Sequence, residues 1–174
     1  MLFEILLSAF SGFCTKISDD ASDKKLNLPL VIPALTSIFY GAALGILAIS
    51  TPLSSLFLAL AIASILTGKI NTYFHILGLI VFTIFILFLP LSYFNIWLFS
   101  IFLVSGIFDE LSLSLGKFVK FLSSERLFTP IASLLVFLLT GQYLFLFAIV
   151  SFDISYRFAR NMLKTSHFPP VCKQ

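Results

Sequence analysis

The sequence predicts an all-α integral membrane protein, with about seven short helices crossing a bilayer. Hydrophobic residues make up 59% of its 174 positions and charged residues only 11%. The mean hydropathy is +1.08. Soluble domains are nearer ~45–50% apolar and ~25% charged. Because much of any folded surface faces water, a soluble chain of this length could not hide so much apolar surface.

Seven apolar segments account for the predicted spans. They cover residues 2–15, 28–49, 53–66, 73–91, 94–108, 127–139 and 143–158. Several are shorter than the ~20 residues that a perpendicular span needs, so they require snorkelling side chains or local thinning of the bilayer. Pro52 and Pro90 fall where spans turn, because proline disrupts a helix interior.

The positions of the cations predict the orientation. With seven spans, all 11 Lys and Arg residues fall on one side, whereas the opposite loops at 50–54 and 91–95 carry no charge. The positive-inside rule then places the N-terminus outside and the C-terminus in the cytoplasm of a cell-membrane protein. Joining residues 127–150 into one helix would give six spans and move Arg157, Arg160, Lys164 and Lys173 to the far side. Seven spans fit the rule better.

A further helix is expected on the cytoplasmic surface, within residues 109–126. Its apolar residues recur at helical i, i+3 and i+4 spacing, which is typical of an amphipathic helix lying on a membrane. These residues are Leu111, Leu115, Phe118, Val119 and Leu122.

The chain reads as one transmembrane domain, residues 1–174, with a faint internal repeat. Ser11-Gly12-Phe13 recurs as Ser105-Gly106-Ile107, and a proline opens the next span in each half, at Pro33 and Pro130. The predicted halves are residues 1–70 and 94–163, with a linker helix at 73–91. Because an odd number of helices, here one, links the two halves, the halves would be parallel and related by an axis along the membrane normal. The matches are few, so chance similarity competes with this interpretation.

The acidic residues supply the main functional candidates. Asp19, Asp20 and Asp23 lie at the cytoplasmic end of the first span. On a continuing helix they share a face at i, i+3 and i+4 spacing. Carboxylates so placed suit Mg²⁺, which keeps several waters and bridges to substrate phosphates. They are the predicted metal ligands, and Mg²⁺ is the predicted cofactor.

This run resembles the D-D-x-x-D signature of enzymes that bind isoprenoid diphosphates, including the membrane prenyltransferases of the UbiA type. The next residues, Lys24, Lys25 and Asn27-Leu28-Pro29, are similar to those after the first motif in that family. The resemblance covers about a dozen positions, and the chain is far shorter than the family's nine-helix body. It implies a phosphorylated lipid or isoprenoid diphosphate as substrate.

A second acidic pair, Asp109 and Glu110, lies at the equivalent end of the fifth span. These two are the predicted catalytic residues, holding a second ion or orienting the substrate. Lys24, Lys25 and Arg126 are the predicted phosphate ligands. The leading hypothesis is therefore a Mg²⁺-dependent enzyme at the cytoplasmic interface.

Other interpretations stay open. The acidic run could be a solvated turn in which Lys16 pairs with Asp20, and Asp153 is spaced for an ion pair with Arg157. A small transporter or channel built on the three-plus-one-plus-three repeat is the alternative function, followed by a membrane scaffold without ligand. No basic run interleaved with aromatic residues indicates nucleic-acid binding. The sequence leaves homo-oligomerisation open.

Overall fold

A computed structural model describes residues 1–22, 29–89, 91, 93–111 and 117–165. Over these residues the chain forms eight helices and no strand. The helices are α1 (Leu2–Ser22), α2 (Val31–Ser50), α3 (Ser54–Leu66), α4 (Tyr73–Phe88), α5 (Ile96–Glu110), α6 (Lys117–Ser124), α7 (Phe128–Thr140) and α8 (Leu144–Thr165). The all-α prediction is confirmed.

Helix ends follow local sequence signals. Asn95 caps α5, because its side-chain oxygen accepts hydrogen bonds from the backbone N–H groups of Trp97 and Leu98 at 2.9 and 3.2 Å. Gly141 ends α7 in the left-handed conformation, with φ of 73°. The predicted interruption between residues 139 and 143 is therefore a real helix break, and the chain turns there into α8.

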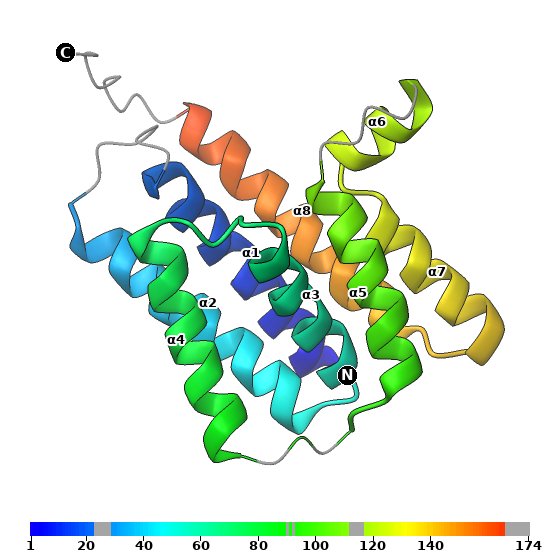
Figure 1. Cartoon of the computed structure of the whole chain (residues 1–174). Coiled ribbons are helices and arrows are strands. Elements are labelled where there is room, and N and C mark those ends of the chain that lie inside the picture. The colour runs from blue at the N-terminus through cyan, green and yellow to red at the C-terminus, as the bar shows by residue number, and fades with distance from the viewer. Residues whose placement is uncertain (23–28, 90, 92, 112–116, 166–174) are drawn as a thin grey trace.

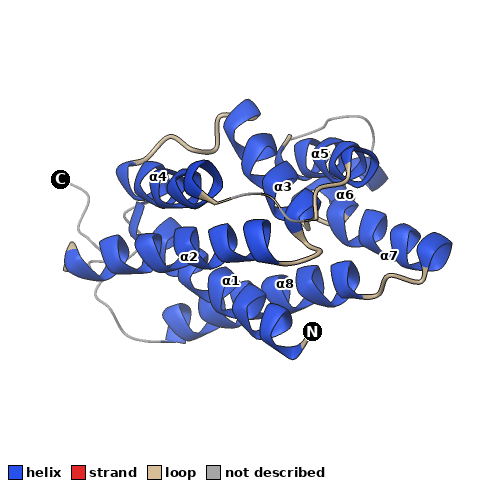
Figure 2. Ribbon diagram, turned by 90° about the horizontal axis from the view of Figure 1, so that it is seen from below, coloured by secondary structure: helices blue, strands red, loops and turns tan. Residues whose placement is uncertain are grey.

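The helices form a bundle in which the first packs against the last (Figure 1). α1 packs on α8 and α2, α2 packs on α4, and α3 packs on α5. Viewed from below, α1 and α8 lie next to each other along one side (Figure 2). The buried core between these pairs is apolar and includes Leu47, Phe57, Phe82, Phe102 and Phe145.

Two helix crossings are close enough to require glycine. A methyl group on Gly12 of α1 would clash with the backbone carbonyl of Phe152 on α8. Likewise, a methyl group on Gly41 of α2 would clash with the backbone of Gly78 on α4. The α1–α8 crossing also carries a buried hydrogen bond, in which the Ser8 hydroxyl donates to the carbonyl of Ala148 at 2.8 Å. Small residues thus let these backbones approach closely.

Helix lengths differ from the predicted spans in several places. α1 continues to Ser22, so it carries Asp19 and Asp20 on regular helix. α6 is only 8 residues long, and residues 112–116 of the predicted amphipathic segment lie outside the described residues. Among the described residues, one helix, at Val31–Ile49, is long and apolar enough to cross a membrane. α3 and α7 have 13 residues each, about 20 Å of helix against a ~30 Å hydrocarbon layer.

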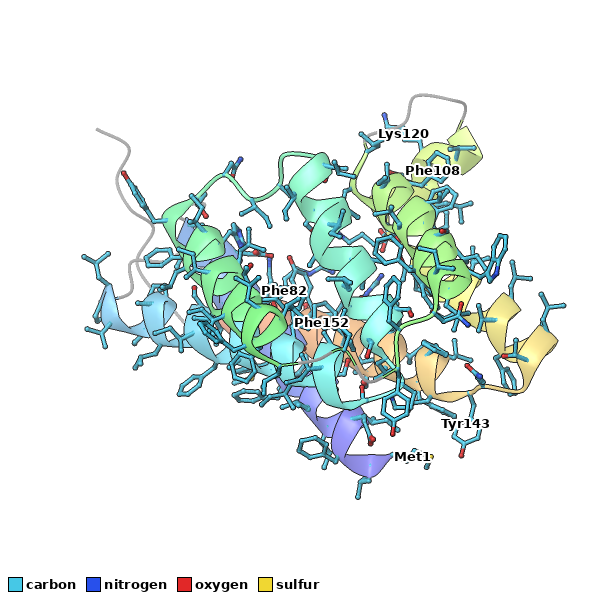
Figure 3. The ribbon with its side chains drawn as sticks, turned by 60° about the horizontal axis from the view of Figure 1, so that its bottom comes forward. Met1, Phe82, Phe108, Lys120, Tyr143 and Phe152 are labelled. Carbon is cyan, nitrogen blue, oxygen red and sulfur yellow. The ribbon has the colours of Figure 1, made fainter. Side chains whose placement is uncertain are left out.

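Lys120 lies at one end of the bundle, whereas Met1 and Tyr143 lie at the other (Figure 3). Large apolar side chains are exposed over much of the outer surface. Leu87, Phe88, Trp97 and Leu139 are each at least 75% exposed. So much exposed apolar surface needs a partner other than water.

Candidate functional site

A cavity of about 500 Å³ lies between the helices. One part of its wall is apolar and includes Leu44, Phe57, Leu79, Phe82 and Phe152. Phe82 of α4 and Phe152 of α8 are labelled near the centre of the molecule in Figure 3. The rest of the wall carries ionisable side chains. These are Lys16, Asp19, Lys69, His75, Asp109, Glu110, Arg126, Asp153 and the two tyrosines Tyr40 and Tyr156.

Asp19 of α1 is the member of the acidic run that lines the cavity. The Tyr156 hydroxyl of α8 donates a hydrogen bond of 2.5 Å to one of its carboxylate oxygens. His75 Nε2, at the start of α4, lies 3.1 Å from the other oxygen. Burial raises the pKa of the Asp19 carboxyl, although the Tyr156 hydrogen bond and nearby positive charges offset part of that rise. Three helices thus meet at one carboxylate.

Asp20 does not line the cavity. Its carboxylate accepts a 2.8 Å hydrogen bond from Lys16 Nζ, and both side chains are buried. The pairing of Lys16 with Asp20 that the solvated-turn alternative included is present, but it lies on α1 with both side chains buried rather than in a solvated turn. Asp23, Lys24 and Lys25 lie outside the described residues, so the three-carboxylate Mg²⁺ site and the two lysine phosphate ligands stay predictions. Over the part of the chain that is described, no three His, Cys, Asp or Glu side chains form a metal-binding group.

Two cations of the site lie against the ring of Tyr156. Lys16 Nζ lies 5.0 Å from the centroid of its ring, and Arg126 Cζ lies 5.8 Å from the same centroid. Both are within the range of a cation–π interaction. Its hydroxyl meanwhile binds Asp19. One aromatic side chain therefore holds two cations and a carboxylate close together at the same end of the cavity.

Asp109 has a structural role that the sequence did not reveal. Its two carboxylate oxygens accept hydrogen bonds of 2.8 Å from the backbone N–H groups of Phe128 and Thr129, the first residues of α7. α7 has no side-chain cap of its own at Leu127, so Asp109 replaces it. A carboxylate also suits the positive end of a helix. Burial raises the pKa of Asp109, and these hydrogen bonds act in the opposite direction.

Glu110 lies between two cations from separate loops. Its Oε2 atom is 3.3 Å from Arg126 Nη2 and 3.8 Å from Lys69 Nζ. Lys69 belongs to the α3–α4 connection, and Arg126 belongs to the α6–α7 connection. Both cations are about half exposed, whereas the Glu110 side chain is only 15% exposed. The three side chains therefore form the rim of the cavity.

Arg126 occupies a backbone position that usually belongs to glycine. Its φ is +53°. The N–H groups of Arg126 and Leu127 donate to the carbonyls of Ser123 and Leu122, at 3.1 and 2.9 Å. This is the Schellman turn that ends a helix, here α6. The left-handed conformation costs a residue with a side chain about 1 kcal/mol or more.

Asp153 and Arg157 are not joined by the expected ion pair. Arg157 Nη1 instead lies 3.2 Å from Glu125 Oε2, on the outer surface. Asp153 lies on the cavity side of α8, one turn before Tyr156. Asp153 and Tyr156 are three residues apart and therefore share one face of α8. That spacing is the signal that could have connected Tyr156 with the site.

Over the residues that the structure describes, the charges that line the cavity nearly cancel. Its lining includes three cations (Lys16, Lys69 and Arg126) and four carboxylates (Asp19, Asp109, Glu110 and Asp153), beside His75.

No protein-family model, curated protein or solved structure matches this chain.

Proposed function

We propose that this chain is a multi-pass membrane enzyme that acts on a phosphorylated lipid or isoprenoid diphosphate at the cytoplasmic face. The cavity carries the proposal: its ionisable end suits a phosphate group, and its apolar wall suits a hydrocarbon chain. An amphipathic ligand matches both ends of such a site. A small polar ligand would leave the apolar wall unused.

The bilayer placement is supported by surface and charge together. Exposed Leu, Ile and Phe side chains lie on the helices, and the cations Lys16, Lys69 and Arg126 lie together beside the cavity. α2 is long enough to span, and the shorter helices would require a locally thinned membrane. The cavity rim then lies at the cytoplasmic end, where a phosphorylated headgroup also lies.

A divalent cation fits the charge of the cavity. With four carboxylates against three cations, a phosphate would enter a site that already has no surplus of positive charge. Mg²⁺ would offset that repulsion and withdraw charge from the phosphate oxygens. Asp19 is the residue of the acidic run placed to hold it, because it alone of Asp19 and Asp20 lines the cavity. Mg²⁺ commonly uses only one or two carboxylates in addition to phosphate oxygens and water.

The remaining residues have distinct roles in this proposal. His75 and Tyr156 orient the Asp19 carboxylate through its two oxygens. Arg126 lines the cavity and would bind phosphate, the role proposed for it from the sequence. Asp109 holds α7 and leaves Glu110 as the acidic residue nearer the rim cations. A catalytic role for Asp109 would require it to act while both its oxygens cap α7.

Thermal unfolding of the purified chain in detergent tests the proposal. Mg²⁺ with farnesyl diphosphate should raise the melting temperature, because a ligand that binds only the folded state stabilises it by ~2.7 kcal/mol at 100 times its Kd. Asp19→Asn should abolish that shift. Dioleoyl phosphatidic acid in place of farnesyl diphosphate distinguishes a glycerolipid from an isoprenoid substrate.

The controls are EDTA and NaCl of matched ionic strength. The exposed-surface variant Glu125→Gln should respond to ligand like the parent chain. A response to NaCl equal to that of Mg²⁺, with no effect of either lipid, would contradict the enzyme proposal and favour a transporter or scaffold.

A further inference from the structure

Two cations from separate connections converge on one oxygen atom at the rim of the cavity. Lys69 and Arg126 both approach Oε2 of Glu110, at 3.8 and 3.3 Å. Lys69 lies in the α3–α4 connection and Arg126 lies in the α6–α7 connection. Only the folded chain therefore brings the two cations together. The position of this oxygen is one that a bound anion would also favour.

Arg126 adopts a backbone conformation that favours glycine. A Schellman turn normally has glycine or asparagine at the left-handed position, and here the residue is arginine with φ of +53°. The guanidinium reaches both Glu110 and the face of the Tyr156 ring. The backbone cost of an arginine at this position is offset by what its guanidinium contacts.

Glu110 is poorly placed as a permanent partner. It is the last residue of α5, where the negative end of the helix dipole disfavours a carboxylate. It also follows Asp109, another carboxylate, whose oxygens are taken by the N-terminus of α7. Its ion pairs are long, and the two cations are about half exposed, so water weakens both pairs. An incoming anion could therefore displace it.

We propose that Lys69 and Arg126 form a phosphate-binding subsite, which Glu110 occupies while no ligand is bound. A phosphate group replaces the carboxylate oxygen, and the planar guanidinium of Arg126 can then bind two phosphate oxygens at once. Glu110 acts as an internal competitor that keeps the two cations in place. This inference rests on the proposed function for the source of the phosphate, and it adds the identity and the regulation of the headgroup site.

Binding of inorganic pyrophosphate to the purified full-length chain, measured calorimetrically in detergent with Mg²⁺, tests the subsite. Glu110→Gln keeps the shape of the side chain and removes its charge, so pyrophosphate affinity should rise about threefold to tenfold. Arg126→Asn tolerates the left-handed backbone and removes the cation, so affinity should fall at least tenfold. Lys69→Gln should also lower affinity.

The surface ion pair between Glu125 and Arg157 supplies matched controls, because neither residue lines the cavity. Glu125→Gln and Arg157→Gln change charge by the same amounts and should leave pyrophosphate affinity unchanged. Both Arg126→Gln and Arg126→Asn remove the charge, but only asparagine tolerates the left-handed backbone. An equal loss of affinity in the two variants shows that the loss depends on the charge, and a loss in Arg126→Gln alone shows that it depends on the turn. Circular dichroism checks that each variant folds.

The outcomes separate this inference from the proposed function. Affinity that is unchanged or lower in Glu110→Gln would overturn the competitor role. If the parent chain binds farnesyl diphosphate but no variant alters pyrophosphate binding as expected, the subsite is wrong and the lipid proposal stands. If Glu110→Gln strengthens pyrophosphate binding while farnesyl diphosphate and phosphatidic acid have no additional effect, the subsite stands and the lipid proposal fails.

Discussion

The carboxylate of Asp109 caps α7 through the backbone N–H of Thr129. The hydrogen bond is 2.8 Å long and joins residues 20 positions apart in the chain. The second carboxylate oxygen accepts the N–H of Phe128 at the same distance. α5 and α7 are therefore joined by a bond between a side chain and a helix end, directly beside the cavity.

Removing this cap should destabilise the fold. Asp109→Ala leaves two backbone donors of α7 without their partner, at a cost of about 1–3 kcal/mol. Asp109→Asn keeps one acceptor oxygen and should cost less. Chemical unfolding in detergent measures both. Equal stability of the parent and the alanine variant would show that the cap contributes nothing, and Glu125→Gln is the surface control.

The crossing of α1 and α8 should not tolerate a larger residue at Gly12. Gly12→Ala puts a methyl group against the carbonyl of Phe152, so the helices must move apart. Overpacking of this kind costs about 1–3 kcal/mol, and Gly12→Val should cost more. Thr83→Ala on the exposed face of α4 is the control. A melting temperature of Gly12→Ala equal to that of the parent would contradict the close approach.

Asp19→Asn should stabilise the ligand-free chain near neutral pH. Because burial raises the pKa of Asp19 in the folded chain, the folded state binds this proton more tightly than the unfolded state does. Stability is therefore fully present below the unfolded pKa and declines as pH rises through the folded pKa. The asparagine variant lacks this decline.

Melting temperatures of both chains across pH measure the difference. The gap between Asp19→Asn and the parent should widen as pH rises from below the ordinary pKa of aspartate towards neutrality. Parallel curves would show that Asp19 does not contribute in this way.

Cysteine labelling in intact cells tests the proposed topology. In a chain whose native Cys172 is replaced by serine, Lys120→Cys should react only with reagents that enter the cytoplasm. Tyr93→Cys, in the uncharged connection before α5, should react with reagents that stay outside. With Cys172 retained, that residue should be reached only from the cytoplasm. Labelling of positions 93 and 120 from the same side would disprove the seven-span arrangement.

The helical part of the fold could be predicted because it depends on local sequence. Apolar runs separated by proline, glycine and charge mark the helices and the break at Gly141. The length of α1 could not be predicted in this way. Its last turn carries Asp19 and Asp20 and lacks basic residues, so neither hydropathy nor the helix dipole favours it. Packing against α8 and α2 stabilises α1 where the local sequence does not.

The candidate site was only partly visible in the sequence. Asp19, Glu110 and Arg126 could be identified as candidates because charged residues stand out in an apolar chain. The contacts of His75 and Tyr156 with Asp19 could not be predicted, because the two residues lie 56 and 137 positions away along the chain. The only local signal was the spacing of Tyr156 from Asp153, which places both on one face of α8. The capping role of Asp109 is likewise hidden, since its partners are backbone atoms.

The pairing of the first helix with the last has a consequence for biosynthesis. The hydrogen bond from Ser8 to Ala148 joins residues 140 positions apart. At translation rates of about 5–20 residues per second, α1 is made roughly 7–30 s before α8. During that interval Gly12 and Ser8 have no docking surface, and Asp19 has no Tyr156. A ribosome that stalls before α8 therefore leaves a chain whose cavity lacks the wall that α8 supplies, Tyr156 included.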